Sequence, residues 1–169
     1  HQIEKIIKEL KAMLQKKASF EILEERVKTL SRLIEGYSIL VKNSEKKIRN
    51  IKGIIEQCVF NIEFRLEAHK IKLEAEFRNK KNNLDALCSE DHVLNALMNL
   101  FDNSIWWLGY SKAKYPEIFL DISDALPGYV SIIIADNGPG FSKSTEEIIK
   151  PFVSDKPGGM GIGLHLTNQ

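Results

Sequence analysis

The spacing of apolar residues changes after residue 42, and this change limits the possible folds more than any other feature of the chain. Before it, apolar side chains recur in steps of three and four residues, the spacing of a coiled coil or helical bundle. The two stripes are Ile3, Ile6, Ile7, Leu10, Met13 and Leu14, and then Phe20, Leu23, Val27, Leu30, Ile34, Tyr37 and Val41. The break between them, with Ser19 as a possible helix cap, predicts an antiparallel helical hairpin over residues 1–42.

After a polar linker at 43–47, the remaining residues, 48–169, mix helical and alternating patterns. The expected elements are helices at 48–68 and 91–108, strands at 71–77, 117–126 and 129–138, and a short extended piece within 82–90. Asp91 is a possible cap of the second helix, and Pro127-Gly128 joins the last two strands as a hairpin turn. The predicted fold class is therefore α+β, with the helical hairpin placed before an α+β domain.

The composition excludes several classes of protein. The formal net charge of +1 predicts no nonspecific affinity for nucleic acid, and the longest apolar runs are far too short for a membrane segment. Cys58 and Cys88 lack the spacing of metal ligands, so we expect reduced core thiols and a cytoplasmic protein. Because the chain does not begin with Met, we expect it to be a piece of a longer protein.

The predicted helix at 91–108 carries two asparagines, Asn99 and Asn103, inside an apolar run. A spacing of four residues places both amides on one face of a helix, one turn apart. Buried amides are costly unless they have partners. The pair therefore indicates either neighbours that bond to both amides or a cavity with a polar ligand.

Two glycine-rich segments follow, DNGPGF at 136–141 and GGMGIGL at 158–164. Asp136 ends a predicted strand, where its carboxylate could accept a hydrogen bond from the exocyclic amine of adenine; the same segment is also an ordinary strand-ending turn. The second segment precedes a helix, whose first N–H groups could bind an anion, but a flexible loop has the same composition. Neither segment is specific when taken alone.

In this order, the three motifs resemble those of the GHKL superfamily of ATP-binding domains, which includes gyrase, heat-shock chaperone, histidine kinase and mismatch-repair ATPases. The resemblance covers roughly residues 47–166, with KPFVSDKPGG at 150–159 similar to the phenylalanine box and ATP lid. It implies an α/β sandwich with a mixed sheet on one layer of helices. The last helix and strand hairpin of the family are missing from the chain, so we expect a domain that is incomplete at its C-terminus.

The resemblance also implies roles for particular residues. Asn103 would coordinate Mg²⁺ through its side-chain oxygen, and Asn99 would lie near the phosphates or a water on the metal. Lys156 would contact the β- and γ-phosphates of ATP. The glycines that would hold the phosphate chain are Gly159, Gly161 and Gly163.

At the adenine end, the resemblance implies that Asp136 reads the base. Gly138 and Gly140 would shape the pocket around the adenine. Trp107 matches an aromatic residue of the family's asparagine box, and we count it with the nucleotide-binding residues.

The residue at 99 indicates which branch of the superfamily the chain resembles. Hydrolytic members have a glutamate there as general base, and the amide of Asn99 cannot take a proton from water at neutral pH. Asparagine at this position, together with the hairpin at 1–42, resembles the histidine-kinase branch, which transfers the γ-phosphoryl of ATP to a histidine. Two hairpins would form a four-helix bundle, so a homodimer is expected, with a response regulator as a possible further partner. The alternative is an ATP-dependent switch that changes its partner contacts without transfer.

The chain also departs from the kinase pattern. Trp106 stands where a basic residue is usual, and Ile149 replaces the first phenylalanine of its box while Phe152 is retained. The usual phosphorylation motif is absent, and only His1, in HQIEKII, comes near it. His1 is thus a candidate phospho-acceptor, with a remnant of a purification tag and an unphosphorylated native residue as the alternatives.

Overall fold

The structure is a computed structural model, and it describes residues 45–79, 84–157, 159 and 161–168 together with the isolated positions 8, 12, 27 and 31. The predicted hairpin at 1–42, its dimer interface and His1 lie outside the described residues, except for those four positions, which are helical. The division into a hairpin, a linker and an ATP-binding domain stays a prediction.

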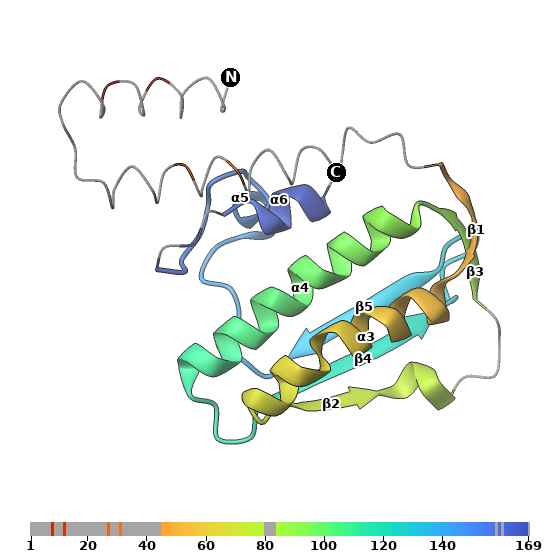
Figure 1. Cartoon of the computed structure of the whole chain (residues 1–169), viewed down its shortest axis with the longest axis horizontal. Helices are drawn as coiled ribbons and strands as arrows, with labels where there is room; N and C mark the ends of the chain where they lie inside the picture. Colours follow the sequence, from red (N-terminus) through yellow and green to blue (C-terminus); the bar gives the residue numbers. More distant parts are fainter. Residues whose placement is uncertain are drawn as a thin grey trace.

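The described part of the chain alternates short strands with two long helices (Figure 1). In chain order the elements are β1 (Lys47–Asn50), α3 (Ile51–Ala68), β2 (Lys72–Ala75), the 3₁₀ helix η1 (Glu76–Asn79), β3 (Asp85–Cys88), α4 (Glu90–Ser111), β4 (Glu117–Ser123), β5 (Ser131–Asp136), α5 (Thr145–Ile148) and α6 (Gly163–Thr167).

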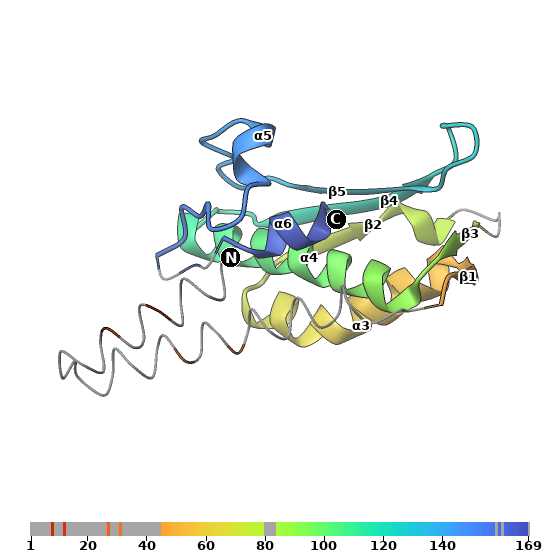
Figure 2. The ribbon, with the colours of Figure 1, turned by 90° about the horizontal axis from the view of Figure 1, so that it is seen from above.

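A three-stranded mixed sheet forms one layer of the domain, and the long helices α3 and α4 form the other (Figure 2). Its order is β2-β4-β5, with β2 parallel to β4 and β4 antiparallel to β5. The long helices α3 and α4 cover one face of this sheet, and α6 lies beside α4. A separate antiparallel pair, β1 and β3, lies at one end of the helices. The fold class is therefore α+β with a mixed sheet on one layer of helices, as predicted.

The core lies between the helices and the sheet. Along β4 every second side chain points toward the helices, so Ile118, Leu120 and Ile122 are almost completely buried, with exposed fractions of 0%, 0% and 1%. Facing them are the apolar side chains of α3 and α4, which are Ile51, Ile54, Ile55, Cys58, Val59, Ile62, Leu66, Leu97, Phe101, Ile105 and Leu108. Among the described helices, none is long and apolar enough to cross a membrane.

Both long helices begin at a polar residue whose side chain caps them. The Asn50 side chain accepts a hydrogen bond from the N–H of Gly53 at 2.9 Å, so α3 starts at Ile51 and not at 48 as predicted. The preceding residues form β1 instead, because they pair with β3. The α4 helix is capped by Ser89, which accepts from the N–H of His92 at 3.3 Å. The prediction that Asp91 is the cap is therefore wrong; its negative charge lies in the first turn, where it favours the helix dipole.

The strands are shorter than predicted. The first ends at Ala75, and the chain continues as the helix η1. The hairpin of β4 and β5 is confirmed, with the N–H of Tyr129 bonded to the carbonyl oxygen of Leu126 at 3.1 Å across the turn. Gly128 in this turn has a φ of 82°, which glycine adopts without strain.

Candidate functional site

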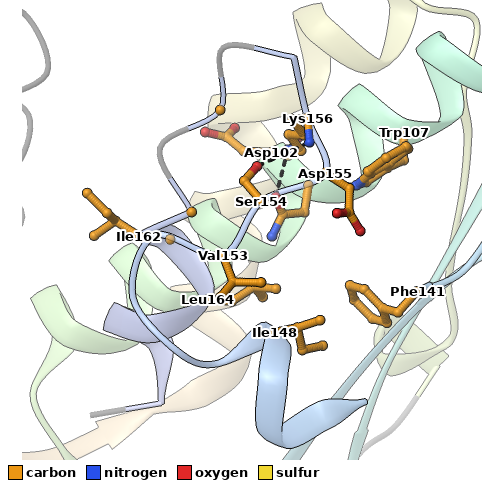
Figure 3. A pocket seen from close by; sticks show the side chains of 14 residues that line it. Asp102, Trp107, Phe141, Ile148, Val153, Ser154, Asp155, Lys156, Ile162 and Leu164 are labelled. Atoms are coloured by element: carbon orange, nitrogen blue, oxygen red, sulfur yellow. Dashed lines mark hydrogen bonds between the residues drawn. The ribbon is translucent and has the colours of Figure 1, made fainter. Parts of the chain in front are cut away.

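A cleft runs along α4 between the end of β5 and the segment that joins α5 to α6. It consists of two adjoining cavities of about 370 and 360 Å³. Four residues line both cavities, which are Asn103, Trp107, Phe141 and Leu164. The shared walls make the cavities two ends of one cleft, with Asp136 at the first end and Lys156 at the second. Figure 3 shows the second end, with Lys156 and Trp107 among its lining residues.

At the first end, the carboxylate of Asp136 is fixed from two sides. The hydroxyl of Ser104 in α4 donates to its Oδ2 at 2.7 Å, and the N–H of Gly138 donates to its Oδ1 at 3.0 Å. A Cβ at residue 138 would lie only 2.7 Å from that Oδ1, so a residue with a side chain would displace the carboxylate. Gly138 is therefore required here by close approach, and the orientation of Asp136 is set before any ligand binds.

At the second end, Lys156 reaches over the side chain of Asn103. Its Nζ donates to Asn103 Oδ1 at 2.6 Å, and the carbonyl oxygen of Asp102 lies 3.5 Å away (Figure 3). The same Nζ lies 5.3 Å from the ring centroid of Trp106. Burial lowers the pKa of Lys156, and the nearby charge of Asp102 opposes this change. The ammonium is thus partly desolvated and held against α4.

The neighbouring residue, Asp155, binds the opposite wall of the cleft. It accepts a hydrogen bond from the hydroxyl of Ser142 at 2.6 Å and pairs with the ammonium of Lys143. Consecutive side chains therefore hold this segment to α4 on one side and to the chain that follows β5 on the other. We call residues 149–162 the lid.

The lid turns back on itself at Gly161. This residue has a φ of 65°, and a Cβ there would overlap the backbone of Val153. The carbonyl oxygen of Gly161 accepts from the N–H of Phe152 at 2.8 Å, which closes the turn. Beyond it, Gly163 starts α6 against Asn99, whose Oδ1 would lie 3.3 Å from a Cβ at 163.

Most of the residues predicted from the sequence meet in this cleft. Those that line its two cavities are Asn103, Trp107, Asp136, Gly140, Lys156, Gly159, Gly161 and Gly163. Gly138 contacts Asp136, and Asn99 lies one turn behind Asn103, beside Gly163. Asn99 itself lines neither cavity of the cleft. His1 lies outside the described residues.

The sequence alone did not identify several residues of the site. Ser104 is a small polar residue in an apolar run next to Asn103, and this position is the sequence signal that marks it. Phe141 and Leu164 were missed because apolar wall residues look like core residues. The link from Asp155 to Ser142 and Lys143 joins exposed residues, and no periodic pattern marks such a contact.

Asn103 fits the role of a metal ligand that the family resemblance implies. Its Oδ1 already accepts from a cation, the ammonium of Lys156, at 2.6 Å. No group of three or more His, Cys, Asp or Glu side chains that could hold a metal exists among the described residues. A metal here would therefore depend on one amide oxygen, on ligand phosphates and on water, since Mg²⁺ at nucleotide sites takes few protein ligands and keeps several waters.

Comparisons with known proteins agree with this geometry. Residues 88–169 match the family described as "Histidine kinase-, DNA gyrase B-, and HSP90-like ATPase". The C4-dicarboxylate transport sensor protein DctB of Rhizobium meliloti is 29% identical over 87 residues, which are 51% of this chain and 14% of that protein. The chain thus spans a small part of the relative's length.

Two solved structures show the same fold. Histidine kinase AdeS of Acinetobacter baumannii superposes with a TM-score of 0.62 at 20% identity, covering 99% of this chain and 83% of that one. The mycobacterial sensor histidine kinase MprB gives a TM-score of 0.58 at 19% identity, covering 73% and 76% of the two chains. Residues 88–169 therefore match this ATPase family, and the fold is that of the two histidine kinase structures. Both findings are consistent with the histidine kinase-type ATPase domain that the sequence predicted.

Proposed function

We propose that the cleft binds ATP together with Mg²⁺, and that the chain is the catalytic part of a histidine protein kinase. The observation that carries this proposal is the continuity of the cleft from Asp136 to Lys156 by way of Asn103. An acceptor for a base thus lies at one end and a cation for phosphates at the other. The family match and the likeness to histidine kinases support the same function.

The base of ATP lies at the Asp136 end. Each carboxylate oxygen has more than one lone pair, so Asp136 accepts from the adenine amine while it keeps its bonds to Ser104 and Gly138. The shared walls Trp107 and Phe141 provide apolar and aromatic surface for the ring. Guanine presents a carbonyl oxygen in place of the amine, and the carboxylate repels it.

The phosphates lie at the lid end. Lys156 binds the β- and γ-phosphates, and Gly159, Gly161 and Gly163 keep side chains out of their path. Asn103 and the phosphate oxygens would hold Mg²⁺, which would neutralise charge on the phosphates. Asn99 orients a phosphate or a water from the next turn of α4.

The cleft favours transfer of the γ-phosphoryl group to a protein side chain over hydrolysis of ATP, because its carboxylates are not free to activate water. Only two carboxylates, Asp102 and Asp155, line the lid end among the described residues. Asp102 pairs with Arg65, and Asp155 pairs with Lys143, so neither is a free base for water. The acceptor is then a histidine, for which His1 on the proposed dimeric hairpin at 1–42 remains the candidate within the chain.

Two measurements test this function. In isothermal titration, ATP should bind only weakly without Mg²⁺ and more tightly with it. Incubation of the longer parent protein with γ-labelled ATP should produce an acid-labile, alkali-stable label, as expected for phosphohistidine, and His1→Gln should abolish it. Label that survives this substitution would assign another acceptor. ATP binding without any label would instead favour an ATP-dependent switch.

A further inference from the structure

We propose that Trp106 is a positioning residue, which holds the lid lysine Lys156 in place over the phosphate end of the cleft. This inference rests on the proposed nucleotide site and adds to it a residue that does not touch the nucleotide. The Lys156 Nζ lies 5.3 Å from the centroid of the Trp106 ring, within the reach of a cation–π interaction.

The Trp106 ring is itself fixed by aromatic neighbours. Tyr110, one turn further along α4, stacks on it with centroids 4.8 Å apart and an interplanar angle of 12°. Trp107 meets it edge-on at 4.8 Å and 87°. All three residues belong to α4, so the ring that faces Lys156 packs against two aromatic neighbours on the same helix, and these contacts restrain its orientation.

Trp106 acts from outside the nucleotide cleft. It lines neither cavity of the cleft, but a separate groove of about 460 Å³ beside Arg65, His69 and Tyr110. Lys156 and Asp102 line both this groove and the lid end of the cleft, and so form part of the wall between them. Trp107, which meets Trp106 edge-on, also lines the cleft, so the route from Trp106 through Lys156 has to be separated from these two neighbours by experiment.

Lys156 needs a second contact because its hydrogen-bond partner, Asn103, is also the proposed ligand of Mg²⁺. The Oδ1 that accepts the ammonium of Lys156 at 2.6 Å is the oxygen proposed to coordinate Mg²⁺. A Mg²⁺ ion on this oxygen would repel the ammonium and weaken its hydrogen bond to Asn103. The carbonyl oxygen of Asp102, 3.5 Å away, and the ring of Trp106 would then hold the ammonium. Cation–π attraction extends to about 6 Å and tolerates a shift of the ammonium toward the phosphates.

Restraint by the ring also lowers the entropic cost of binding. The four-carbon stem of lysine is flexible and loses freedom when its ammonium binds a phosphate. A lysine that is already held over the site loses less. Removal of the ring should therefore weaken ligands that have phosphates and leave ligands without them unaffected.

The test compares Trp106→Leu with Trp106→Phe by isothermal titration with Mg²⁺·ATP and with adenosine. Trp106→Leu should weaken Mg²⁺·ATP by about 3- to 10-fold, the effect of one cation–π contact, and leave adenosine within about twofold. Trp106→Phe retains an aromatic face and should recover most of the loss. Tyr115→Leu is the matched control, because it removes a similar pair, with Lys114 Nζ 5.4 Å from the ring, away from the cleft.

A double-mutant cycle with Lys156→Met decides whether the effect passes through the lysine. In the Lys156→Met protein, Trp106→Leu should change ATP affinity no further. A loss that persists there, or an equal loss for adenosine, would show that Trp106 supports only the structure of α4 and would overturn the proposal. Absence of ATP binding by the unchanged protein would overturn the proposed function and this inference together.

Discussion

At the scale of single residues, the carboxylate of Asp136 is the group proposed to determine which base the cleft accepts. Ser104 and Gly138 hold it in one orientation, so its remaining lone pairs have a fixed direction. Because the Asp136 carboxylate is already ordered, it loses little conformational entropy when it accepts a hydrogen bond from the adenine amine. It repels the carbonyl oxygen that guanine has at the same position. In the proposed site, one carboxylate would read the base, and the Ser104 hydroxyl and the Gly138 N–H would hold that carboxylate in place.

We expect the unchanged protein to prefer ATP over GTP by about 1–3 kcal/mol, the cost of an unpaired buried polar group. Asp136→Ala should remove most of this preference, because no carboxylate remains to distinguish the amine from the carbonyl. Isothermal titration with both nucleotides measures it, and Asp124→Ala, at an exposed position after β4, is the control. Equal affinities for ATP and GTP in the unchanged protein would contradict the assignment of Asp136.

Cys58 should be nearly inert as a thiol. It is fully buried, at 0% exposure, and burial, aided by the charge of Asp102, raises its pKa from 9.0 to about 11. The thiolate is the reactive form, so at pH 8 Cys58 should react with iodoacetamide far more slowly than the half-buried Cys88. With Cys88→Ser as the background, labelling should require denaturant; rapid labelling of the folded variant would contradict this.

The raised pKa of Cys58 also makes the stability of the folded protein depend on pH. The folded thiol of Cys58 keeps its proton to about pH 11, whereas an ordinary thiol loses it near 9.0. The folded state therefore binds more protons between these values. As a result, this group makes the protein less stable as the pH rises from about 9 to 11.

At the scale of elements, local signals predicted the long helices and the hairpin but not their exact ends. The periodic stripe of α3 continues through Ile48, so periodicity alone extends the helix to that residue. The cap at Asn50 and the pairing of β1 with β3 end it earlier. That pairing joins residues about 40 positions apart, and a single sequence carries little information about such contacts.

Replacement of Asn50, the cap of α3, should show how much the cap contributes to the free energy of unfolding. Asn50→Ala removes the acceptor for the Gly53 N–H, and we expect a loss of about 1 kcal/mol in the free energy of unfolding. Asn50→Asp keeps an acceptor at the start of α3 and should cost much less. Urea unfolding followed by circular dichroism measures both variants. An equal loss in the two would mean that the side chain acts through β1 and not as a cap.

More of the candidate site than of the strand pairing could be predicted from the sequence, and the reason is physical. Asn103, Asp136 and Lys156 belong to compact motifs in which ligand contacts require particular residue types at short spacings. The bonds from Ser104 to Asp136 and from Asp155 to Lys143 depend instead on how separate elements pack. Such supporting contacts become visible only with the fold.

At the scale of the whole molecule, phosphoryl transfer requires that the ATP-binding domain and an acceptor histidine meet. The apolar stripes of residues 1–42 are the feature that would bring two chains together, because one hairpin cannot cover both of its stripes. Two hairpins packed as a four-helix bundle would bury them. Dimerisation through this segment remains a prediction from the sequence.

Leu30 lies in the middle of the second stripe, so Leu30→Asp would place an unpaired charge in the dimer interface. We expect the unchanged protein to sediment as a dimer at tens of micromolar and the variant as a monomer. Ser31→Asp is the matched control: it adds the same charge at the next position, which is helical and exposed, so the dimer should survive. Because the cleft lies outside the hairpin, ATP affinity of Leu30→Asp should stay unchanged while labelling of histidine is lost. A monomeric unchanged protein, or dissociation by both variants, would contradict a dimer built on this stripe.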